Sequence, residues 1–492
     1  MKRRILHLPL TLCLYLGLCS SCTSESKDSI VEDNLTFAQS QLRVAFDEID
    51  YARTNETPES RKEREKKDWG ELTNPRNSEP DGSLHLVPSK DWTSGFFPGE
   101  LWYLYEYTQN NFWKKKAQQH TDMLEREKMN GKTHDMGFKM YCSYGNGYRL
   151  TQDERYKEIL LQSARTLSTR FKPQAGIIRS WDHSRKKWDC PVIIDNMMNL
   201  ELLFWATRES KDSTFYHIAV SHARTTMKNH FRPDNSCYHV IDYDTISGKV
   251  LKKNTHQGLS HESAWSRGQA WALYGYTMCY RETKLPEFLQ QAKNVEEYLF
   301  NHPHMPADYI PYWDFDAPNI PNEPRDASAA TIIASALYEL SLYDSENTGR
   351  YKERADKILE NLTKNYRSAT GKNNGFLLLH STGTKPSDVE VDVPIVYADY
   401  YFIEALLRKD KLEKTGTFTV GGTVVDTKAR IIATVTVSTV VSRDNIVYFV
   451  DAGASEFTAK GQETVEANAG TIKNTVPDQA YSEASGWGFT NS

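Results

Sequence analysis

Residues 278–292, MCYRETKLPEFLQQA, contain the pattern that decides the fold. One run of apolar and aromatic residues ends in polar positions, a turn follows, and a second run begins at once. Apolar residues recur at spacings of three and four on both sides of the turn, which is typical of two amphipathic helices. The arrangement recurs in residues 147–160 (GYRLTQDERYKEIL), 204–219 (FWATRESKDSTFYHIA) and 337–355 (LYELSLYDSENTGRYKERA). The sequence therefore predicts a chain of helical hairpins on short connections.

About twelve helical segments are predicted over residues 35–412, beginning near residues 35, 98, 112, 137, 154, 196, 213, 264, 286, 327, 348 and 394. Connections within the hairpins are short, whereas those between hairpins are long and rich in Trp, Asp, His, Pro and Gly. Tight turns on one side and long, chemically diverse loops on the other are typical of a closed ring with one functional face. We therefore predict an all-α fold, an (α/α)6 barrel or toroid of six hairpins, with an open α-solenoid as the alternative.

The two ends of the chain differ from this helical body. Residues 1–22 combine a basic start, a short apolar stretch and the sequence LCSSC, which is typical of a lipoprotein signal peptide with Cys22 lipidated; ordinary signal cleavage is the alternative. Residues 23–34 would be a flexible tether, and the protein would lie in the periplasm or cell envelope, held to the membrane through a lipid anchor alone. Residues 415–492 are rich in Thr, Val and Gly with a period of two, which predicts a small β-rich accessory module, short for a complete sandwich.

The composition limits the partners and the chemistry. A net charge of −5 argues against general nucleic-acid binding, yet it is compatible with a local basic pocket for an anionic substrate. Aromatic residues make up 12% of the chain, which fits either a large core or stacking surfaces for sugar rings. Cys142, Cys190, Cys237 and Cys279 are widely spaced, so free buried thiols are expected. No metal or cofactor is predicted, and the choice between monomer and dimer stays open.

Two aspartates in the long connections are candidates for acid–base chemistry. Asp135 lies in THDMGFKMY and Asp195 in IIDNMMNLELL, each just before a predicted helix and among large apolar residues. One interpretation is structural, because aspartate is a preferred helix N-cap. The other is catalytic: burial raises the pKa of a carboxyl group, and two carboxylates that converge on a central cavity split their pKa values and leave one protonated as a general acid.

A third connection, THQGLSHESAWSRGQAW (residues 255–271), concentrates polar and aromatic side chains. Arg267 and Trp271 are four residues apart and therefore share a helix face. A guanidinium beside an indole suits a carboxylated sugar, since the fork would hold the carboxylate while the ring stacks. An ion pair between Arg267 and Glu262, with Trp271 in the core, would explain the same residues.

Together these motifs resemble glycoside hydrolase family 88, the unsaturated glucuronyl hydrolases. The resemblance covers roughly residues 35–410 and rests on WTSGFFPG, HDMGF, IDNMMNLELL, THQG, WSRGQAW and RDASAA, in this order. It implies an (α/α)6 barrel, catalysis by Asp135 and Asp195, and a hydrolase for 4,5-unsaturated uronic acids. These sugars stand at the non-reducing end of glycosaminoglycan disaccharides and oligosaccharides that polysaccharide lyases produce. The β-rich tail lies outside the resemblance.

The resemblance further implies hydration of the C4=C5 double bond in place of attack at the anomeric carbon. This bond is an enol ether, so protonation at C4 places positive charge on C5 and the ring oxygen, where a carboxylate can stabilise it. Asp195 is the expected acid. Asp135 is the expected paired carboxylate, which keeps Asp195 protonated and helps to orient the sugar. This chemistry needs no cofactor.

The resemblance also implies a set of residues that line the sugar site: His239, Lys253, Thr255, Gln257, Arg267 and Trp271, with Trp181 as a stacking surface. The segment HSTGTKPSD (residues 380–388) resembles a loop that binds sulfate in family members acting on sulfated glycosaminoglycans, with Ser381, Thr384 and Lys385 as the expected contacts. Two alternatives stay open, an unsaturated rhamnogalacturonyl hydrolase of family 105 and a non-catalytic glycan-binding lipoprotein. The second would not need both aspartates.

Overall fold

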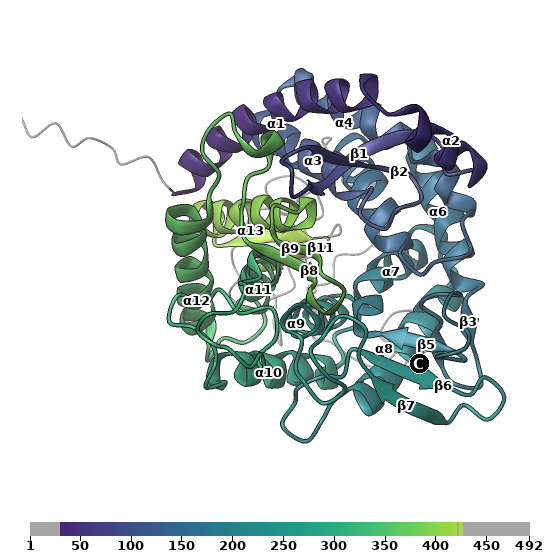
Figure 1. Cartoon of the computed structure of the whole chain (residues 1–492). Helices are drawn as coiled ribbons and strands as arrows, with labels where there is room; N and C mark the ends of the chain where they lie inside the picture. The colour runs from purple at the N-terminus through teal and green to yellow at the C-terminus, as the bar shows by residue number, and fades with distance from the viewer. Residues whose placement is uncertain (1–29, 421–422, 427–492) are drawn as a thin grey trace, which may run out of the picture.

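Two concentric rings of helices form the body of the protein (Figure 1). The computed structural model describes residues 30–420 and 423–426. The inner ring consists of α3 (Phe96–Thr108), α5 (Asn146–Thr151), α7 (Leu200–Ser210), α9 (Ser266–Thr283), α11 (Ala327–Leu340) and α13 (Val396–Thr415). The outer ring consists of α1 (Ile30–Thr54), α4 (Asn111–Asp122), α6 (Glu154–Ser168), α8 (Ser213–His230), α10 (Pro286–Asn301) and α12 (Thr348–Asn361).

The ring is closed by the first and last helices of the described body. α13 packs against α1 on its outer side and against α3 and α11 within the inner ring. Contacts continue from α11 through α9 and α7 to the π-helix η2 (Gly137–Gly145), and from η2 back to α3. The closed (α/α)6 barrel is therefore confirmed, and the open solenoid is not the fold.

Four of the six hairpins share one kind of two-residue turn. The inner helix ends in Thr or Ser and is followed by a residue with positive φ, namely Gln109 (52°), Gln152 (56°), Lys211 (61°) or Lys284 (55°). The hydroxyl of that last helical residue accepts the N–H of the second turn residue, as from Asn110 to Thr108 at 3.2 Å. The side chain of the second turn residue then caps the next helix at Asn110, Asp153 and Asp212, while Pro286 opens the fourth. These signals are local, which explains why the hairpins are visible in the sequence.

The opposite end of the barrel carries the long connections and most of the β-structure. The antiparallel pairs are β1 (Leu72–Ser78) with β2 (Leu84–Pro88), β3 (Phe171–Lys172) with β4 (Ile177–Ile178), and β8 (Ser381–Thr384) with β9 (Val389–Val393). A three-stranded antiparallel sheet contains β5 (Pro191–Ile193), β6 (Val240–Tyr243) and β7 (Val250–Asn254). None of these strands was predicted from the sequence, and neither was helix α2 (Pro58–Lys66). A period in the hydrophobic residues is hard to recognise over so few positions.

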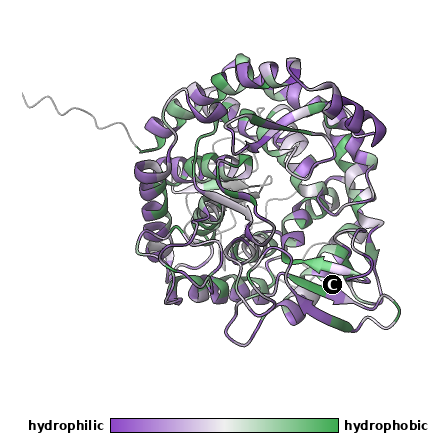
Figure 2. Ribbon diagram, in the orientation of Figure 1, coloured by the Kyte–Doolittle hydropathy of each residue, from purple (hydrophilic) through white to green (hydrophobic). Residues whose placement is uncertain are grey.

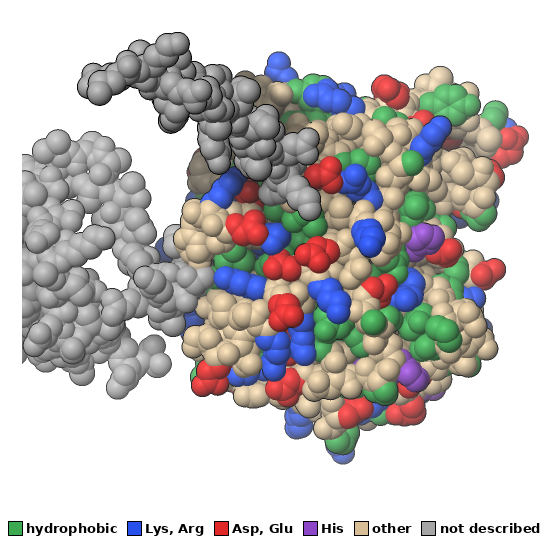
Figure 3. Space-filling view, turned by 90° about the vertical axis from the view of Figure 1, so that its left-hand side faces the viewer, with side chains coloured by type: hydrophobic (Ala, Val, Ile, Leu, Met, Phe, Trp, Pro, Cys, Tyr) green, Lys and Arg blue, Asp and Glu red, His purple; other side chains and the backbone are tan. Residues whose placement is uncertain are grey.

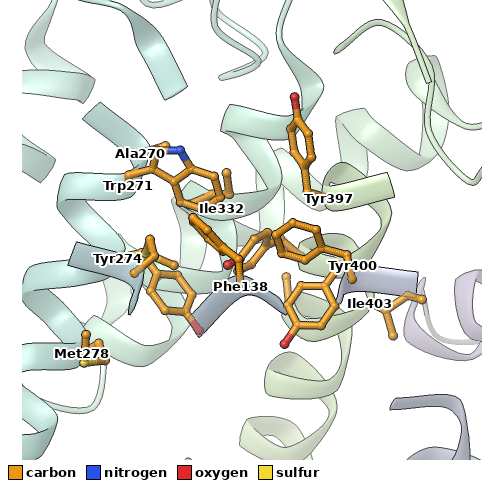
Figure 4. Close-up of a cluster of buried hydrophobic side chains, with 14 of the residues drawn as sticks. Phe138, Ala270, Trp271, Tyr274, Met278, Ile332, Tyr397, Tyr400 and Ile403 are labelled. Atoms are coloured by element: carbon orange, nitrogen blue, oxygen red, sulfur yellow. The ribbon is translucent and has the colours of Figure 1, made fainter. Parts of the chain in front are cut away.

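The axis of the barrel is filled with side chains. Phe138, Trp271, Tyr274 and Tyr400 lie close together around it, with the ring centroids of Phe138 and Trp271 5.2 Å apart (Figure 4). α11 is buried on all sides, and its many small residues let the neighbouring helices approach closely. The outer helices bury one face, so that hydrophilic residues cover the rim of the barrel (Figure 2). Acidic and basic side chains are interspersed over the flank that faces the viewer in Figure 3.

The ends of the predicted domains differ in detail from the structure. α1 begins at Ile30 because Val31 and Leu35 are buried against the barrel, so the last five residues of the predicted tether, 30–34, are helical. β10 (Thr417–Val420) pairs antiparallel with β11 (Thr423–Asp426) directly after α13, at the start of the predicted β-rich module. Cys22 and residues 427–492 lie outside the described residues.

Two further observations concern cysteines and membrane spans. Cys142, Cys190, Cys237 and Cys279 are free thiols, as predicted, and all but the half-buried Cys142 are buried. Within residues 30–420 and 423–426, no helix combines the length and the apolar character that crossing a bilayer requires.

Candidate active site

Asp195 lies at the long-loop end of the barrel, on the short 3-10 helix η3 (Ile194–Asn199) that joins β5 to α7. All six residues of η3 are buried, and Asp195 is 8% exposed. The interpretation of Asp195 as a helix N-cap is wrong, because Ile193 precedes η3 and no side chain caps it. Among the described residues, Oδ2 of Asp195 has no hydrogen-bond partner. A buried carboxyl oxygen without a partner is rare and points to a role beyond structure.

A glycine brings Asp135 to the same place. Asp135 lies two residues before the start of η2, and Gly137 packs so closely on η3 that a Cβ there would lie 2.6 Å from the Cα of Asn199. The N–H of Phe138 donates to Oδ1 of Asn199 at 3.1 Å. The glycine of HDMGF and the last asparagine of IDNMMN therefore lock the two aspartate segments together. The π-helical form of η2 is itself a feature often found at functional sites.

The carboxylate of Asp135 is held by its own neighbours in the chain. The hydroxyl of Thr133 donates to one carboxylate oxygen at 2.5 Å, and Nε2 of His134 lies 3.2 Å from the other. No side chain caps η2, so the N-cap interpretation of Asp135 is wrong as well. Asp135 is more exposed than Asp195, with 18% of its side chain open against 11%. It therefore remains the better solvated of the two carboxylates.

His239 on the loop before β6 faces Asp195. Its Nδ1 accepts the backbone N–H groups of His256 and Gln257 at 3.1 and 3.2 Å. Burial lowers the pKa of His239 well below its ordinary value, so the ring is neutral and its proton sits on Nε2. That nitrogen lies 3.7 Å from Oδ2 of Asp195, which is too long for a hydrogen bond. A neutral N–H donor thus stands opposite the free carboxyl oxygen.

Burial raises the pKa of Asp195 to about 7. The positive charge of Arg267 opposes this rise, and the negative charge of Asp135 adds to it. Asp195 is therefore a carboxylic acid that can hold its proton near neutral pH, which general acid catalysis requires. A buried carboxyl group with a raised pKa thus lies within electrostatic reach of a second carboxylate.

Arg267 does not have the role predicted for it. One terminal nitrogen donates to Asp326 at 2.8 Å, and both terminal nitrogens donate to backbone carbonyls of β8, on Thr382 and Gly383, at 2.5 and 2.7 Å. The prediction of a guanidinium free to hold a sugar carboxylate and the prediction of an ion pair with Glu262 are thus both wrong. The guanidinium is already engaged in a buried ion pair and in hydrogen bonds to a strand. Arg267 is 1% exposed and fixes the strand that flanks the site.

Trp271, Trp181 and Lys253 occupy three different environments. Trp271 is fully buried below the site; its indole N–H makes no hydrogen bond of ordinary geometry within the described residues, but it lies near enough to Asp195 to oppose the rise in the pKa of that carboxyl group. Trp181 is half-buried at the rim, where its backbone pairs with Thr133. Lys253 is exposed on β7, with its ammonium 4.9 Å from the centroid of the Tyr238 ring. Trp181 can therefore meet a bound sugar at the surface, whereas Trp271 shapes the floor.

The three residues expected to contact substrate sulfate lie on β8 and in the turn after it, in three different environments. Ser381 is 0% exposed, so its hydroxyl does not face solvent. Nε2 of Gln257 donates to Oγ1 of Thr384 at 3.3 Å, while Thr255 accepts the N–H of Gly258 at 2.8 Å. Lys385 alone of the three lines an open hollow of about 440 Å³ on this face, together with Leu259, Trp313 and Glu323.

Sequence reasoning missed several residues of the site. Trp265 packs against His239, the N–H donor that faces Asp195, with the two ring centroids 4.6 Å apart. Asp326 caps α11 and forms an ion pair with Arg267 that the sequence did not indicate. Among residues 30–420 and 423–426, no group of His, Cys, Asp and Glu side chains is arranged to hold a metal ion.

Comparison with known proteins agrees with this geometry. The sequence profile of Glycosyl Hydrolase Family 88 matches residues 72–421. An unsaturated glucuronyl hydrolase of Formosa agariphila is 53% identical over 331 residues, which cover 67% of this chain and 82% of that protein. The crystal structure of an unsaturated glucuronyl hydrolase specific for heparin superimposes with a TM-score of 0.72 at 46% identity, covering 79% of this chain and 98% of that one.

A more distant structure was solved with a sugar bound. A variant of the unsaturated glucuronyl hydrolase from Streptococcus agalactiae, complexed with dGlcA-GalNAc6S, has a TM-score of 0.62 at 28% identity and covers 77% of this chain and 91% of that one. The profile match spans the whole inner ring and both aspartate motifs. This chain belongs to Glycosyl Hydrolase Family 88.

Proposed function

We propose that this glycoside hydrolase is an unsaturated glucuronyl hydrolase, which adds water across the C4=C5 bond of a 4,5-unsaturated uronic acid at the non-reducing end of glycosaminoglycan fragments. The single observation that carries the proposal is the buried carboxyl group of Asp195, whose pKa is raised to about 7 next to the second carboxylate, Asp135. A buried acid beside a second carboxylate is an arrangement that general acid catalysis requires and that sugar binding alone does not.

The first chemical step is proton transfer from Asp195 to C4 of the sugar. The electron pair of the C4=C5 bond forms the new C4–H bond, and positive charge develops on C5 and the ring oxygen. Asp195 leaves this step as a carboxylate beside that charge and stabilises it. The neutral His239 donor, 3.7 Å from the Asp195 carboxylate, can then share the new negative charge.

Water completes the reaction at C5. Its oxygen bonds to C5 while one of its protons passes to the Asp195 carboxylate, which restores the acid. The product is a hemiketal at C5, which opens spontaneously and releases the rest of the saccharide. The net change is the addition of one water, and Asp135 holds Asp195 in its protonated form between cycles.

A direct assay tests the proposal. Unsaturated disaccharides absorb ultraviolet light through the C4=C5 bond conjugated to the carboxylate, and hydration removes this absorbance. The wild-type protein is expected to bleach the disaccharides made by glycosaminoglycan lyases. Constant absorbance across heparin-derived and chondroitin-derived disaccharides would overturn the assignment.

We further propose that the substrate is sulfated and that Lys385 binds part of its sulfate. The similarity to a heparin-specific enzyme at 46% identity supports this choice, as does the position of Lys385 in a hollow on the active face. A lysine ammonium contributes a charge-assisted contact to a sulfate oxygen.

Lys385→Ala is expected to lower kcat/KM about tenfold on sulfated disaccharides and less than twofold on unsulfated ones, in line with a contact worth about 1–2 kcal/mol. Steady-state kinetics on a matched pair of substrates measures this selectivity. The control is Lys364→Ala, which removes an exposed lysine on the outer ring. An equal loss on both substrates would count against sulfate recognition by Lys385.

We also propose that the chain is a lipoprotein anchored through Cys22, with residues 415–492 as a small β-rich accessory module that binds carbohydrate or acts as a spacer. The support is the leader sequence and the strand-like composition of the tail. Cys22→Ser is expected to move the protein from the membrane fraction to the soluble fraction of the cell. Fractionation and mass spectrometry of the mature N-terminus check this, and an unmodified Cys22 in the wild type would refute the anchor.

A further inference from the structure

A group of exposed lysines stands beside the active site on the loop before β5 and on β7. Lys252 on β7 donates through Nζ to the backbone carbonyl of Lys187 at 2.8 Å, which ties the two segments together. β7 is the outer strand of its sheet, and Lys252, Lys253 and Asn254 make up its polar half. We call this group the lysine ridge; it consists of Lys186, Lys187, Lys249, Lys252 and Lys253.

Neighbouring acids oppose little of the positive charge of the ridge; Asp244, between β6 and β7, interacts with the charge of Lys249. Within the described part of the chain, none of its five lysines forms an ion pair, and all are exposed. The closest acids in the sequence are mostly engaged elsewhere: Asp182 pairs with Arg170 and Arg179, and the buried Asp242 accepts two backbone N–H groups. Asp189 is the one exposed acid of the loop. In a chain of net charge −5, the ridge is a local concentration of positive charge.

A continuous path of side chains connects the ridge to the catalytic carboxylates. Thr133, which donates to Asp135, pairs through its backbone with Trp181. The ring centroid of Trp181 lies 5.7 Å from that of His256, whose backbone N–H donates to His239. On its other side, the ring centroid of Trp181 lies 5.4 Å from that of Trp188, and the ammonium of Lys187 lies 4.3 Å from the Trp188 ring. Trp181 therefore stands between Asp135 and the lysines.

The charge of one lysine of the ridge also reaches the histidines of the site. After burial, the charge of Lys187 is the largest cause that lowers the pKa of His256, and it also contributes to the low pKa of His239. An anionic saccharide that leaves the site over Trp181 meets the ridge next.

We propose that the lysine ridge is a subsite for the sugars that follow the first two of a bound saccharide, where it binds their sulfate and carboxylate groups. The enzyme then prefers anionic tetrasaccharides and longer fragments over disaccharides. This inference rests on the proposed function, since it assumes that the unsaturated sugar occupies the Asp135–Asp195 site. Lysine ammonium groups are point charges that suit the varied positions of sulfates along a flexible chain.

The test compares an unsaturated disaccharide with an unsaturated tetrasaccharide of the same sulfated glycosaminoglycan. The wild type is expected to show a kcat/KM at low salt about fivefold higher for the tetrasaccharide, and the advantage is expected to vanish at about 0.5 M salt because the charges are screened. Lys187→Gln/Lys252→Gln is expected to remove the advantage while changing disaccharide turnover less than twofold. The matched control is Lys62→Gln/Lys115→Gln, which removes two exposed lysines on α2 and α4 and leaves the advantage intact.

Two results would overturn the subsite: tetrasaccharide turnover that is unchanged in Lys187→Gln/Lys252→Gln, or a loss equal for both substrates. A control that loses the advantage to the same extent would also overturn it, because net charge would then be the cause. Titration calorimetry of the tetrasaccharide on Asp195→Asn protein separates this question from the catalytic one. Binding that weakens about fivefold with the ridge substitutions supports the subsite even if no substrate is turned over, and unchanged binding refutes it.

Discussion

Asp195→Asn is expected to lower kcat by about 10³- to 10⁴-fold, because the amide keeps the shape of the side chain and loses the proton that C4 must receive. The change in KM is expected to be small, since the sugar is bound by other groups. Loss of ultraviolet absorbance under saturating disaccharide measures kcat. Asp135→Asn is the partner experiment: it removes the charge that favours protonation of Asp195, so a shift of the pH profile to lower pH accompanies its loss of rate. A kcat unchanged in Asp195→Asn would refute the assignment of the acid.

Asp195→Asn is also expected to stabilise the protein at alkaline pH. The carboxyl of Asp195 holds its proton up to about pH 7 in the native state, against an ordinary pKa of 3.8 when the chain is unfolded. Between these values the native state binds the extra proton, so its stability falls as the pH rises, and above pH 7 the buried charge costs on the order of 4 kcal/mol. Asp195→Asn removes this cost. Its gain in the free energy of unfolding is thus expected at pH 8 and absent near pH 4, as urea denaturation at both pH values would show.

Arg267→Met is expected to lower the free energy of unfolding by about 3–5 kcal/mol, because it leaves Asp326 buried without its partner. The carbonyls of Thr382 and Gly383 lose their donors as well, so β8 is released and turnover falls with the stability. Arg224→Met provides the control, since Arg224 pairs with Glu287 on the surface and its loss is expected to cost less than about 1 kcal/mol.

Combining Arg267→Met with Asp326→Asn separates the two explanations of Arg267. If Arg267 acts by holding Asp326 and β8, the double variant is expected to be more stable than Arg267→Met alone, because no buried charge is then unpaired. Denaturant unfolding at equilibrium measures both variants. A variant Arg267→Met with native stability and a KM raised tenfold or more would show instead that the guanidinium contacts the sugar directly.

The hairpins were predictable because their signals are local. The Thr or Ser at the end of an inner helix, the residue with positive φ and the capping Asp or Asn follow one another along the chain, as in residues 108–110 and 151–153. The strands of the long-loop end were not predictable, since β3 to β5 contain two or three residues each and depend on partners far away in the sequence.

The aspartates were recognisable by their motifs, but the reason for their chemistry was not. The structure alone shows that the glycine in HDMGF lets two segments approach closely, with Asn199 as its partner. Arg267 was misassigned because spacing places a side chain on a helix face and says nothing about what covers that face. Ser381 was misassigned for the same reason, since its burial depends on strands and helices that meet over it.

The sequence by itself determined the ring of hairpins, the order of the motifs and the identity of the two carboxylates, because turn chemistry, helical periodicity and motif content are properties of neighbouring residues. The tertiary structure alone decided that Asp195 is buried with a free oxygen opposite His239, that Arg267 holds Asp326, and that Lys187 and Lys252 stand beside the site. Burial and electrostatic interaction depend on distances through space, and those are set only when the six hairpins close into a barrel.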